Sequence, residues 1–314
     1  MLEEYKKKAV LNKKFVIILP FFNESDLILE LIEIIESKIQ HIKEEFILLF
    51  VNDGSTDNTS LLIKNHTLKS KNITLQVIEL NGNTGHQNAI RQGLMYTNEN
   101  YINTIKGVII MDSDGEDNPD ALNELVNKEN FEVVFVSRGK RKEDLMFRFS
   151  YLIYKLIFKT ITGKQINFGN YSMLSPKVLS SIADKHFFHY SAFISKQKFK
   201  IEKIQYNRNK RLKGKSKMNF KNLLLHALKS FIEYYEELIF FQVKVFVFIL
   251  MIFISILGYV LYTKYVTRTA LLGWSSNLLM GLINGLLIMF SSIIISTLLV
   301  TIKNSLDQKK IEMK

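Results

Sequence analysis

Gly107 to Asp120 reads GVIIMDSDGEDNPD, and this stretch decides the fold. Its first part, Val108 to Met111, is a short apolar run rich in β-branched residues, which is typical of a buried strand. Acidic residues follow at positions 112, 114, 116 and 117. In open α/β sheets, ligands bind at the carboxyl ends of strands, where this pattern places the acidic residues. Crowded carboxylates repel one another, and Mg²⁺ or Mn²⁺ would relieve the repulsion.

A lone D-x-D pattern also fits an acidic turn that caps a helix beginning at Pro119. The surrounding sequence favours the ligand site, because strand-like and helix-like segments alternate around it. Strands are expected over residues 15–19, 46–51, 73–80, 107–111 and 132–136. Helices are expected over 25–39, from 57, over 85–96 and from 119. This alternation predicts a parallel sheet covered by helices on both faces.

Apolar residues dominate from about Leu238 onward. Residues 238–262 and 271–302 are each long enough to cross a bilayer core of roughly 30 Å, and their length disfavours two buried core helices of a soluble protein. The run Phe15 to Phe22 is short and broken by Pro20, so it does not resemble a signal peptide. Lys and Arg flank the pair of spans on both sides. We therefore expect a multi-pass protein of the inner membrane whose N-terminal domain faces the cytoplasm.

The chain has a net charge of +12, and much of it lies in Arg208 to Lys217, just before the spans. A basic run beside a span indicates contact with anionic lipid headgroups. No nucleic-acid motif accompanies the charge, so no nucleic-acid partner is expected. Residues 145–161 and 219–231 are amphipathic and could lie in the membrane interface or be ordinary domain helices. The absence of cysteine excludes disulfides and thiolate sites.

Polar turns follow the first three expected strands. A carboxylate at a strand end before a glycine, as in Asp53-Gly54, can accept hydrogen bonds from a base or a sugar. Thr56 or Asp57 could equally serve to cap the next helix. The segment NTGHQNA (83–89) opens a third helix, whose N-terminus could face a phosphate.

Together these motifs resemble family 2 glycosyltransferases of the GT-A fold, within the branch that loads sugars onto polyprenyl or dolichyl phosphate. They are LPFFNE (19–24), VNDGSTDNT (51–59), NTGHQNAIRQG (83–93), MDSDGEDNP (111–119), VSR (136–138) and RLKGKSK (211–217). The resemblance implies an α/β, Rossmann-like, mostly parallel sheet with flanking helices, interfacial amphipathic helices and two C-terminal transmembrane helices. The expected divisions are a catalytic domain (1–210, with the amphipathic helix 145–162), a basic juxtamembrane segment (211–237), the spans (238–302) and a cytoplasmic tail (303–314).

The resemblance also implies site residues. Those expected around the nucleotide are Pro20, Phe22, Glu24, Asp53 and Ser113. Those expected to hold Mg²⁺ or Mn²⁺, and through it the diphosphate, are Asp112, Asp114 and Glu116. Guanidinium groups suit phosphate oxygens, so Arg138 and Arg148 would act with Asp112 and Asp114 as catalytic groups. A basic loop over the donor and acceptor phosphates would contain Arg211, Lys215 and Lys217.

The implied activity is inverting, metal-dependent transfer of one sugar from a nucleotide-sugar, by family habit a UDP-sugar, to a polyprenyl phosphate such as undecaprenyl phosphate. Asn170 stands where many relatives have aspartate, which removes a general base. An anionic phosphate acceptor tolerates this loss. A hydroxyl acceptor on a glycolipid or surface polysaccharide would need another base, such as Asp117 or Asp120.

Other readings concern the role of the whole chain. A membrane scaffold with a vestigial nucleotide-binding domain is the non-enzymatic alternative, and clustered carboxylates argue against it. Trp274, the only tryptophan, lies in the membrane region, so the Q-x-x-R-W motif of processive synthases is absent. Gly281 and Gly285 form a small-xxx-small pair through which the chain could form a homo-oligomer.

Overall fold

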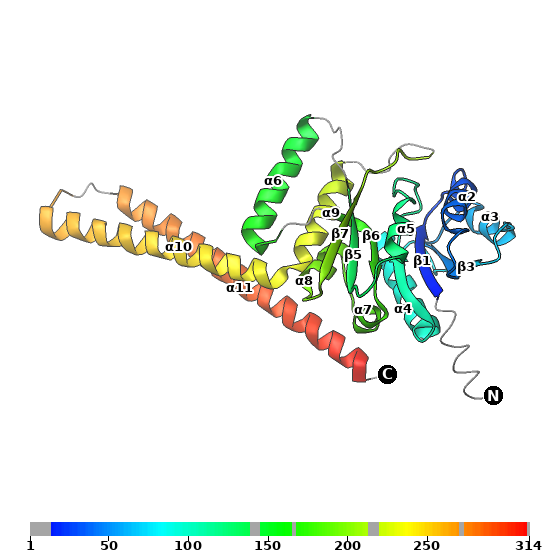
Figure 1. Cartoon of the computed structure of the whole chain (residues 1–314). Helices are drawn as coiled ribbons and strands as arrows, with labels where there is room; N and C mark the ends of the chain where they lie inside the picture. The colour runs from blue at the N-terminus through cyan, green and yellow to red at the C-terminus, as the bar shows by residue number, and fades with distance from the viewer. Residues whose placement is uncertain (1–13, 139–144, 165–167, 213–219, 270–272, 313–314) are drawn as a thin grey trace. The chain divides into compact units, whose positions relative to one another are not determined.

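The structure, a computed structural model, describes residues 14–138, 145–164, 168–212, 220–269 and 273–312. It divides into two compact units, and most of their elements are labelled in Figure 1. The first unit comprises residues 1–151 and 165–233, and the second comprises residues 152–164 and 234–314.

A seven-stranded sheet forms the first unit, in the order β3-β2-β1-β4-β6-β5-β7. Its strands are β1 (Lys14–Phe21), β2 (Phe46–Asn52), β3 (Ile73–Glu79), β4 (Ile105–Ile110), β5 (Val133–Arg138), β6 (Phe168–Leu174) and β7 (Ile201–Tyr206). Neighbours pair in parallel except β6, which runs antiparallel to both β4 and β5. The prediction of a mostly parallel sheet is therefore confirmed, with one reversed strand that was not predicted.

The reversed strand brings its beginning to the edge where the other strands end. Ile110, the last residue of β4, pairs with Ser172 of β6. Asn170 precedes Ser172 by two residues and so projects past the end of β4. The carboxyl ends of β1, β2, β4 and β5 and the first residues of β6 therefore meet at one edge of the sheet, which is the edge predicted to bind ligands.

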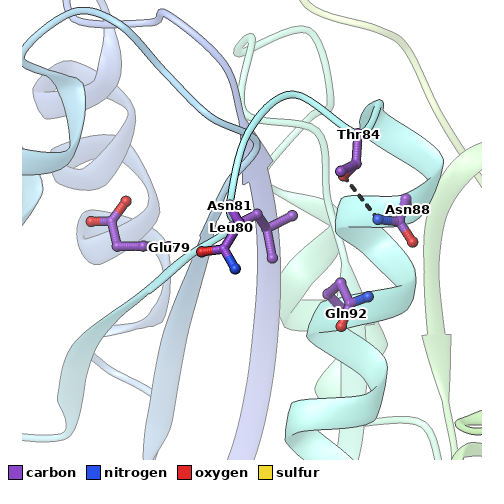
Figure 2. Close-up of a pocket in the computed structure, with 6 residues that line it drawn as sticks. All are labelled: Glu79, Leu80, Asn81, Thr84, Asn88 and Gln92. Atoms are coloured by element: carbon purple, nitrogen blue, oxygen red, sulfur yellow. Dashed lines mark hydrogen bonds between the residues drawn. The ribbon is translucent and has the colours of Figure 1, made fainter.

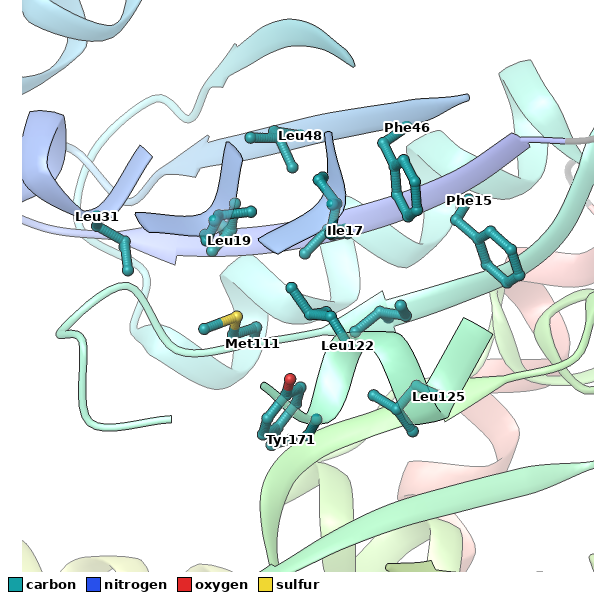
Figure 3. Packing of buried hydrophobic residues seen from close by; sticks show 14 of the residues in the cluster. Phe15, Ile17, Leu19, Leu31, Phe46, Leu48, Met111, Leu122, Leu125 and Tyr171 are labelled. Atoms are coloured by element: carbon teal, nitrogen blue, oxygen red, sulfur yellow. The ribbon is translucent and has the colours of Figure 1, made fainter. Parts of the chain in front are cut away.

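Helices pack on both faces of this sheet. They are α2 (Ile28–Ile39), α3 (Thr59–Asn65), α4 (His86–Tyr101), α5 (Ala121–Val126), α7 (Pro176–Ile182) and α8 (Tyr190–Lys196). A further helix, α9 (Phe220–Glu233), packs against α8. The side chains of successive residues in β1 point to opposite faces of the sheet. Ile17 and Leu19 belong to a buried cluster with Leu122 of α5, seen in Figure 3. Ile18 belongs to the other cluster, with Ile90 of α4.

Strands through residue 138 and the helices after β1 to β4 agree with the sequence prediction to within a few residues. No element was predicted between residues 168 and 206, where the structure has β6, α7, α8 and β7. Amphipathic helices were predicted at 145–161 and 219–231, and the structure has α6 (Leu145–Thr162) and α9 there. Side chains on both helices remain exposed: Leu152, Ile153, Leu156, Ile157, Leu225, Leu228 and Ile232.

The second unit contains the later part of α6 and two long helices, α10 (Tyr235–Tyr262) and α11 (Trp274–Glu312), with a short π-helix, Thr263–Thr267, after α10. Phe246 of α10 and Phe290 of α11 lie 6.2 Å apart between ring centroids. The stretches Tyr235–Thr267 and Ser275–Ile302 are long and apolar enough to span a membrane. Hardly any of their described residues are buried, which distinguishes them from core helices of a soluble protein.

Candidate active site

The acidic loop, Asp112–Asp117, leaves β4 at the ligand edge of the sheet and folds back on itself. The Asp112 N–H donates a hydrogen bond to Asp117 Oδ2 at 2.9 Å. The Glu116 N–H donates to Asp114 Oδ1 at 3.0 Å. Gly115 makes this turn with φ of +76°, a conformation that favours glycine. The turn gathers the predicted metal ligands in one short loop.

Ser113 connects the acidic loop to the end of β1. Its buried hydroxyl donates to the Pro20 carbonyl oxygen at 2.6 Å. Pro20 is itself buried, and Phe22 and Glu24, which follow it, are partly exposed. The predicted nucleotide-binding segment 19–24 and the acidic loop are thus brought together at one edge of the sheet.

Asp53 anchors the turn that begins α4. One of its oxygens accepts hydrogen bonds from the Thr84 N–H at 2.7 Å and from the Thr84 hydroxyl at 3.0 Å. The Gly85 N–H donates to its other oxygen at 2.9 Å. Asp53 therefore lies at the predicted edge, but its carboxylate is occupied by hydrogen bonds from the backbone N–H groups of Thr84 and Gly85. A direct contact with nucleotide stays a prediction.

Asp57 contributes to a second anchor, between β1 and the turn after β2. Its carboxylate accepts from the Thr59 hydroxyl at 2.6 Å and from the Ser25 N–H at 3.2 Å. Burial raises the pKa of Asp57, but these hydrogen bonds outweigh burial and lower it overall. This residue serves the fold by joining two turns of the ligand edge.

His86, the first residue of α4, lies between two groups of the site, and the sequence interpretation gave it no role. Its Nε2 is 3.1 Å from Asp112 Oδ1 and 3.2 Å from Asn170 Nδ2. Burial acts to lower the pKa of His86, but the charges of Asp112 and the neighbouring carboxylates raise it overall. The motif GHQN contained the signal, although nothing in the sequence placed this histidine beside residue 170.

Two arginines from the segment after β7 pair with the acidic groups. Arg208 Nη2 lies 2.6 Å from Glu116 Oε2 and 3.9 Å from Asp114 Oδ2. Arg211 contacts Glu24 through Nη2 at 2.9 Å and approaches Asp114 through Nη1 at 3.8 Å. Arg211 was predicted in this region and Arg208 was not.

Asp114 lies among like charges in the acidic loop. Burial raises the pKa of its carboxyl, and the negative charges of Asp112 and Glu116 raise it further. The Glu116 N–H and the positive charge of Arg208 act in the opposite direction without cancelling the increase. The folded protein thus holds excess negative charge here, which a bound cation would relieve.

Oxygen ligands of this kind suit Mg²⁺ or Mn²⁺. Among the residues that the structure describes, however, no three histidine, cysteine or acidic side chains are arranged as a metal-binding group. The contacts explain this, because Asp112 faces His86 while Glu116 faces Arg208. The donor chemistry fits a divalent cation, and Glu116 would have to leave its arginine to hold one.

Other predicted site residues are described less fully. Arg138 ends β5 at the ligand edge, and Arg148 lies in the first turns of α6. The side chains of both are outside the described part of the structure, as are Lys215 and Lys217 entirely. Their predicted phosphate contacts stay predictions.

Two hollows lie near this edge. A cavity of about 270 Å³, shown in Figure 2, is lined by Glu79, Leu80, Asn81, Thr84, Asn88 and Gln92. No residue of the acidic loop lines it. A hollow of only about 10 Å³ adjoins the loop, between Glu116, Tyr171 and Arg208 among others. The carboxylates are therefore closely covered by neighbouring side chains.

Comparison with known proteins agrees with this geometry. The model of the family described as "Glycosyl transferase family 2" matches residues 16–217. The uncharacterized glycosyltransferase YkcC of Bacillus subtilis (strain 168) is 27% identical over 292 residues, which cover 90% of this chain and 87% of YkcC. The undecaprenyl-phosphate 4-deoxy-4-formamido-L-arabinose transferase of Salmonella choleraesuis is 26% identical, over 52% of this chain and 47% of that protein.

Solved structures show the same fold at low identity. Mannosyl-3-phosphoglycerate synthase from Rubrobacter xylanophilus aligns with a TM-score of 0.55 and 16% identity, over 74% of this chain and 76% of its own. Glucosyl-3-phosphoglycerate synthase from Mycobacterium tuberculosis, in complex with Mn²⁺, UDP and phosphoglyceric acid, aligns with a TM-score of 0.51 and 16% identity. The alignment covers 73% of this chain and 80% of that synthase. With its family model matched along most of the sheet unit and its acidic loop at the ligand edge, the chain belongs to glycosyl transferase family 2.

Proposed function

We propose that this glycosyltransferase moves a single sugar from a nucleotide-sugar, most simply a UDP-sugar, to a polyprenyl phosphate in the membrane, with inversion at the anomeric carbon. The acidic loop at the carboxyl edge of the sheet carries the proposal, because it places Asp112, Asp114 and Glu116 beside the segment 19–24. Support for the donor comes from the Mycobacterium tuberculosis neighbour, which was crystallised with Mn²⁺ and UDP.

The chemistry needs little from the protein beyond charge and position. An oxygen of the acceptor phosphate attacks the anomeric carbon as the bond from that carbon to the donor diphosphate breaks. The bonding electrons leave with the nucleoside diphosphate, and no proton has to move. A divalent cation held by Asp112, Asp114 and Glu116 would neutralise charge on the leaving group. Arg211, with Arg138 and Arg148 as predicted, would bind phosphate oxygens.

Asp117 and Asp120, the two carboxylates predicted as substitutes for the missing general base, already have partners, which favours a phosphate acceptor. Asp117 is buried and accepts the Asp112 N–H. Asp120 pairs with Lys38 at 2.6 Å. Asn170 cannot accept a proton. Either carboxylate would have to give up or share these contacts to deprotonate a hydroxyl acceptor, whereas a phosphate is already anionic.

Membrane features support a lipid-borne acceptor. Two helices are long and apolar enough to span, and α6 and α9 carry exposed leucine and isoleucine side chains. We propose a multi-pass protein of the inner membrane, with the sheet unit facing the cytoplasm and contacting anionic lipids. The Salmonella relative, whose name specifies undecaprenyl phosphate, supports the same acceptor class.

To test this proposal, membranes that contain the full chain are incubated with labelled UDP-sugars, Mn²⁺ and undecaprenyl phosphate. The expected product is a lipid-linked monosaccharide that mild acid releases, since a sugar phosphodiester hydrolyses readily. An acid-stable product would instead indicate an ordinary glycoside and a hydroxyl acceptor. Absence of transfer from every donor, with the Asp114→Asn variant no different from wild type, would reject enzymatic transfer altogether.

A further inference from the structure

A short segment after β7, the strap (Asn207–Leu212), is docked on the acidic loop. The Asn209 N–H donates to the Glu116 carbonyl oxygen at 2.9 Å. Asn118 Nδ2 donates to the Asn207 carbonyl oxygen at 3.3 Å. These backbone contacts hold the strap in place independently of its charged side chains.

Gly115 leaves room for the strap. A Cβ at this position would lie 2.5 Å from Leu212 Cγ, well inside van der Waals contact. Leu212 in turn packs against the buried cluster below the loop. The acidic loop therefore has a glycine at the point where the strap approaches most closely, for reasons of space as well as of backbone conformation.

The strap places its guanidinium groups where the predicted metal ligands are. Arg208 Nη2 lies 2.6 Å from Glu116 Oε2, and only 15% of the Arg208 side chain and 10% of the Glu116 side chain are exposed. A largely buried pair of this kind is strongly destabilised when one partner is removed. Arg208 Nε is also buried and has no hydrogen-bond partner among the described residues, so the guanidinium retains a donor to offer.

We infer that Arg208 is the resident counter-cation of the acidic loop and a binding residue for the donor diphosphate. While no donor is present it neutralises Glu116. When Glu116 turns to a divalent cation, Arg208 transfers to the phosphate oxygens that arrive with it. The identity of that anion rests on the proposed function, whereas the competition between Arg208 and a metal does not.

This arrangement has a thermodynamic consequence. A metal alone must separate Glu116 from Arg208 and leave a guanidinium unpaired, so it binds weakly. A metal with a nucleoside diphosphate supplies phosphate oxygens, which guanidinium groups bind bidentately. Metal and nucleotide therefore favour each other's binding, and the coupling is reciprocal.

Titration calorimetry on the detergent-solubilised full chain tests the inference, with Mn²⁺ alone, UDP alone, and Mn²⁺ in the presence of UDP. In Arg208→Gln, Mn²⁺ alone is expected to bind at least tenfold tighter than in wild type. The gain in Mn²⁺ affinity that UDP produces should shrink by a similar factor. Arg208→Lys should keep the affinity for Mn²⁺ alone close to wild type, because it retains the charge, but should show a smaller gain with UDP, because an ammonium group cannot bind phosphate bidentately.

Lys128→Gln is the matched control, since it removes a cation paired with Glu202 at 3.6 Å, away from the acidic loop. It should leave Mn²⁺ binding unchanged. Gly115→Ala gives a second route, because displacing the strap should also strengthen binding of Mn²⁺ alone. Unchanged or weaker Mn²⁺ binding in both Arg208→Gln and Gly115→Ala, with wild type still binding Mn²⁺ and UDP together, would overturn the inference alone. Wild type that binds neither would overturn the proposed function as well.

Discussion

At the scale of single residues, carboxylates at the same edge of the sheet have different roles. Asp53 and Asp57 accept hydrogen bonds from backbone and hydroxyl groups and join the turns of the edge. Asp114 is held against its own electrostatic preference beside Asp112 and Glu116. In the sequence, all of these carboxylates stand in polar turns after strands. Only their contacts distinguish structural carboxylates from those that could bind a ligand.

Asp114→Asn should stabilise the ligand-free protein while removing Mn²⁺-dependent nucleotide binding. Because burial and like charge raise the pKa of Asp114, its carboxylate disfavours the folded state above that pKa. The increase in the free energy of unfolding should be on the order of 1 kcal/mol, as is common for stabilising substitutions, and should be greatest near neutral pH. It should fade as pH falls through the raised pKa and be absent below the unfolded value of 3.8. Thermal unfolding across this pH range measures it, and a lower Tm at pH 7 would contradict it.

Asp53→Ala should destabilise the sheet unit rather than weaken nucleotide binding selectively. The substitution leaves the N–H groups of Thr84 and Gly85 without their acceptor, and hydrogen bonds to a charged group contribute about 1.5–3 kcal/mol each. Denaturant unfolding of the variant should show a loss on this order. Asp26→Ala, at an exposed position near the same edge, serves as the comparison. Unchanged stability with reduced UDP affinity would assign Asp53 to the nucleotide instead.

At the scale of elements, local patterns predict the first five strands of the sheet, β1 to β5, and miss the last two, β6 and β7. β1 is apolar from Phe15 to Phe21, and the last three residues of β4 are apolar and β-branched. A polar turn soon follows each of these runs and marks the end of the strand. β7 is IEKIQY, whose alternation is weak, and β6 contains Asn170 and Ser172. The helices between them have only seven residues each. Strand reversal is a property of chain topology, so no local pattern could have shown that β6 runs backwards.

The same scale explains what was missed in the site. Metal-site residues were predicted from one contiguous motif. The contacts of Arg208 with Glu116 and of His86 with Asn170 join elements far apart in the chain. Long-range contacts of this kind follow from the arrangement of β6 and β7 beside β4 and β5, which sequence spacing does not encode.

Gly115→Ala should loosen the strap, for reasons of both space and conformation. An alanine there takes on a left-handed φ of +76° and a clash with Leu212. Gly163→Ala is matched for conformation, with φ of +69°, but its Cβ would meet nothing within 4 Å. Backbone strain of about 1–2 kcal/mol is common to both. Trypsin should therefore cleave after Arg211 faster in Gly115→Ala than in wild type, and Gly163→Ala should not differ. Equal rates in all three proteins would refute the close packing.

At the scale of the whole molecule, the sheet unit with its acidic loop is followed in the chain by a pair of long apolar helices. Composition alone predicts an apolar C-terminal region, because the apolar residues after about Leu238 are hardly interrupted. The predicted domain boundaries stay predictions. The helix α9, which the sequence placed in a juxtamembrane segment, groups with the sheet unit, and Glu233 at its end accepts the His189 N–H at 3.0 Å.

Membrane orientation can be measured directly, since the chain contains no cysteine. Thr267→Cys lies in the turn after α10, and Asn127→Cys lies on the exposed end of α5. In intact cells a membrane-impermeant maleimide should label Thr267→Cys and spare Asn127→Cys. Permeabilised cells should show labelling of both. The reverse pattern in intact cells would place the sheet unit outside, away from cytoplasmic nucleotide-sugars.

The reversed course of β6 has one more consequence. Ser137, next to the end of β5, pairs with Phe168 at the start of β6. Because this pairing joins β5 directly to β6, the position of Asn170 beside His86 depends on the register of the two strands. Insertions between Arg138 and Phe168 should therefore be tolerated without moving Asn170 away from His86.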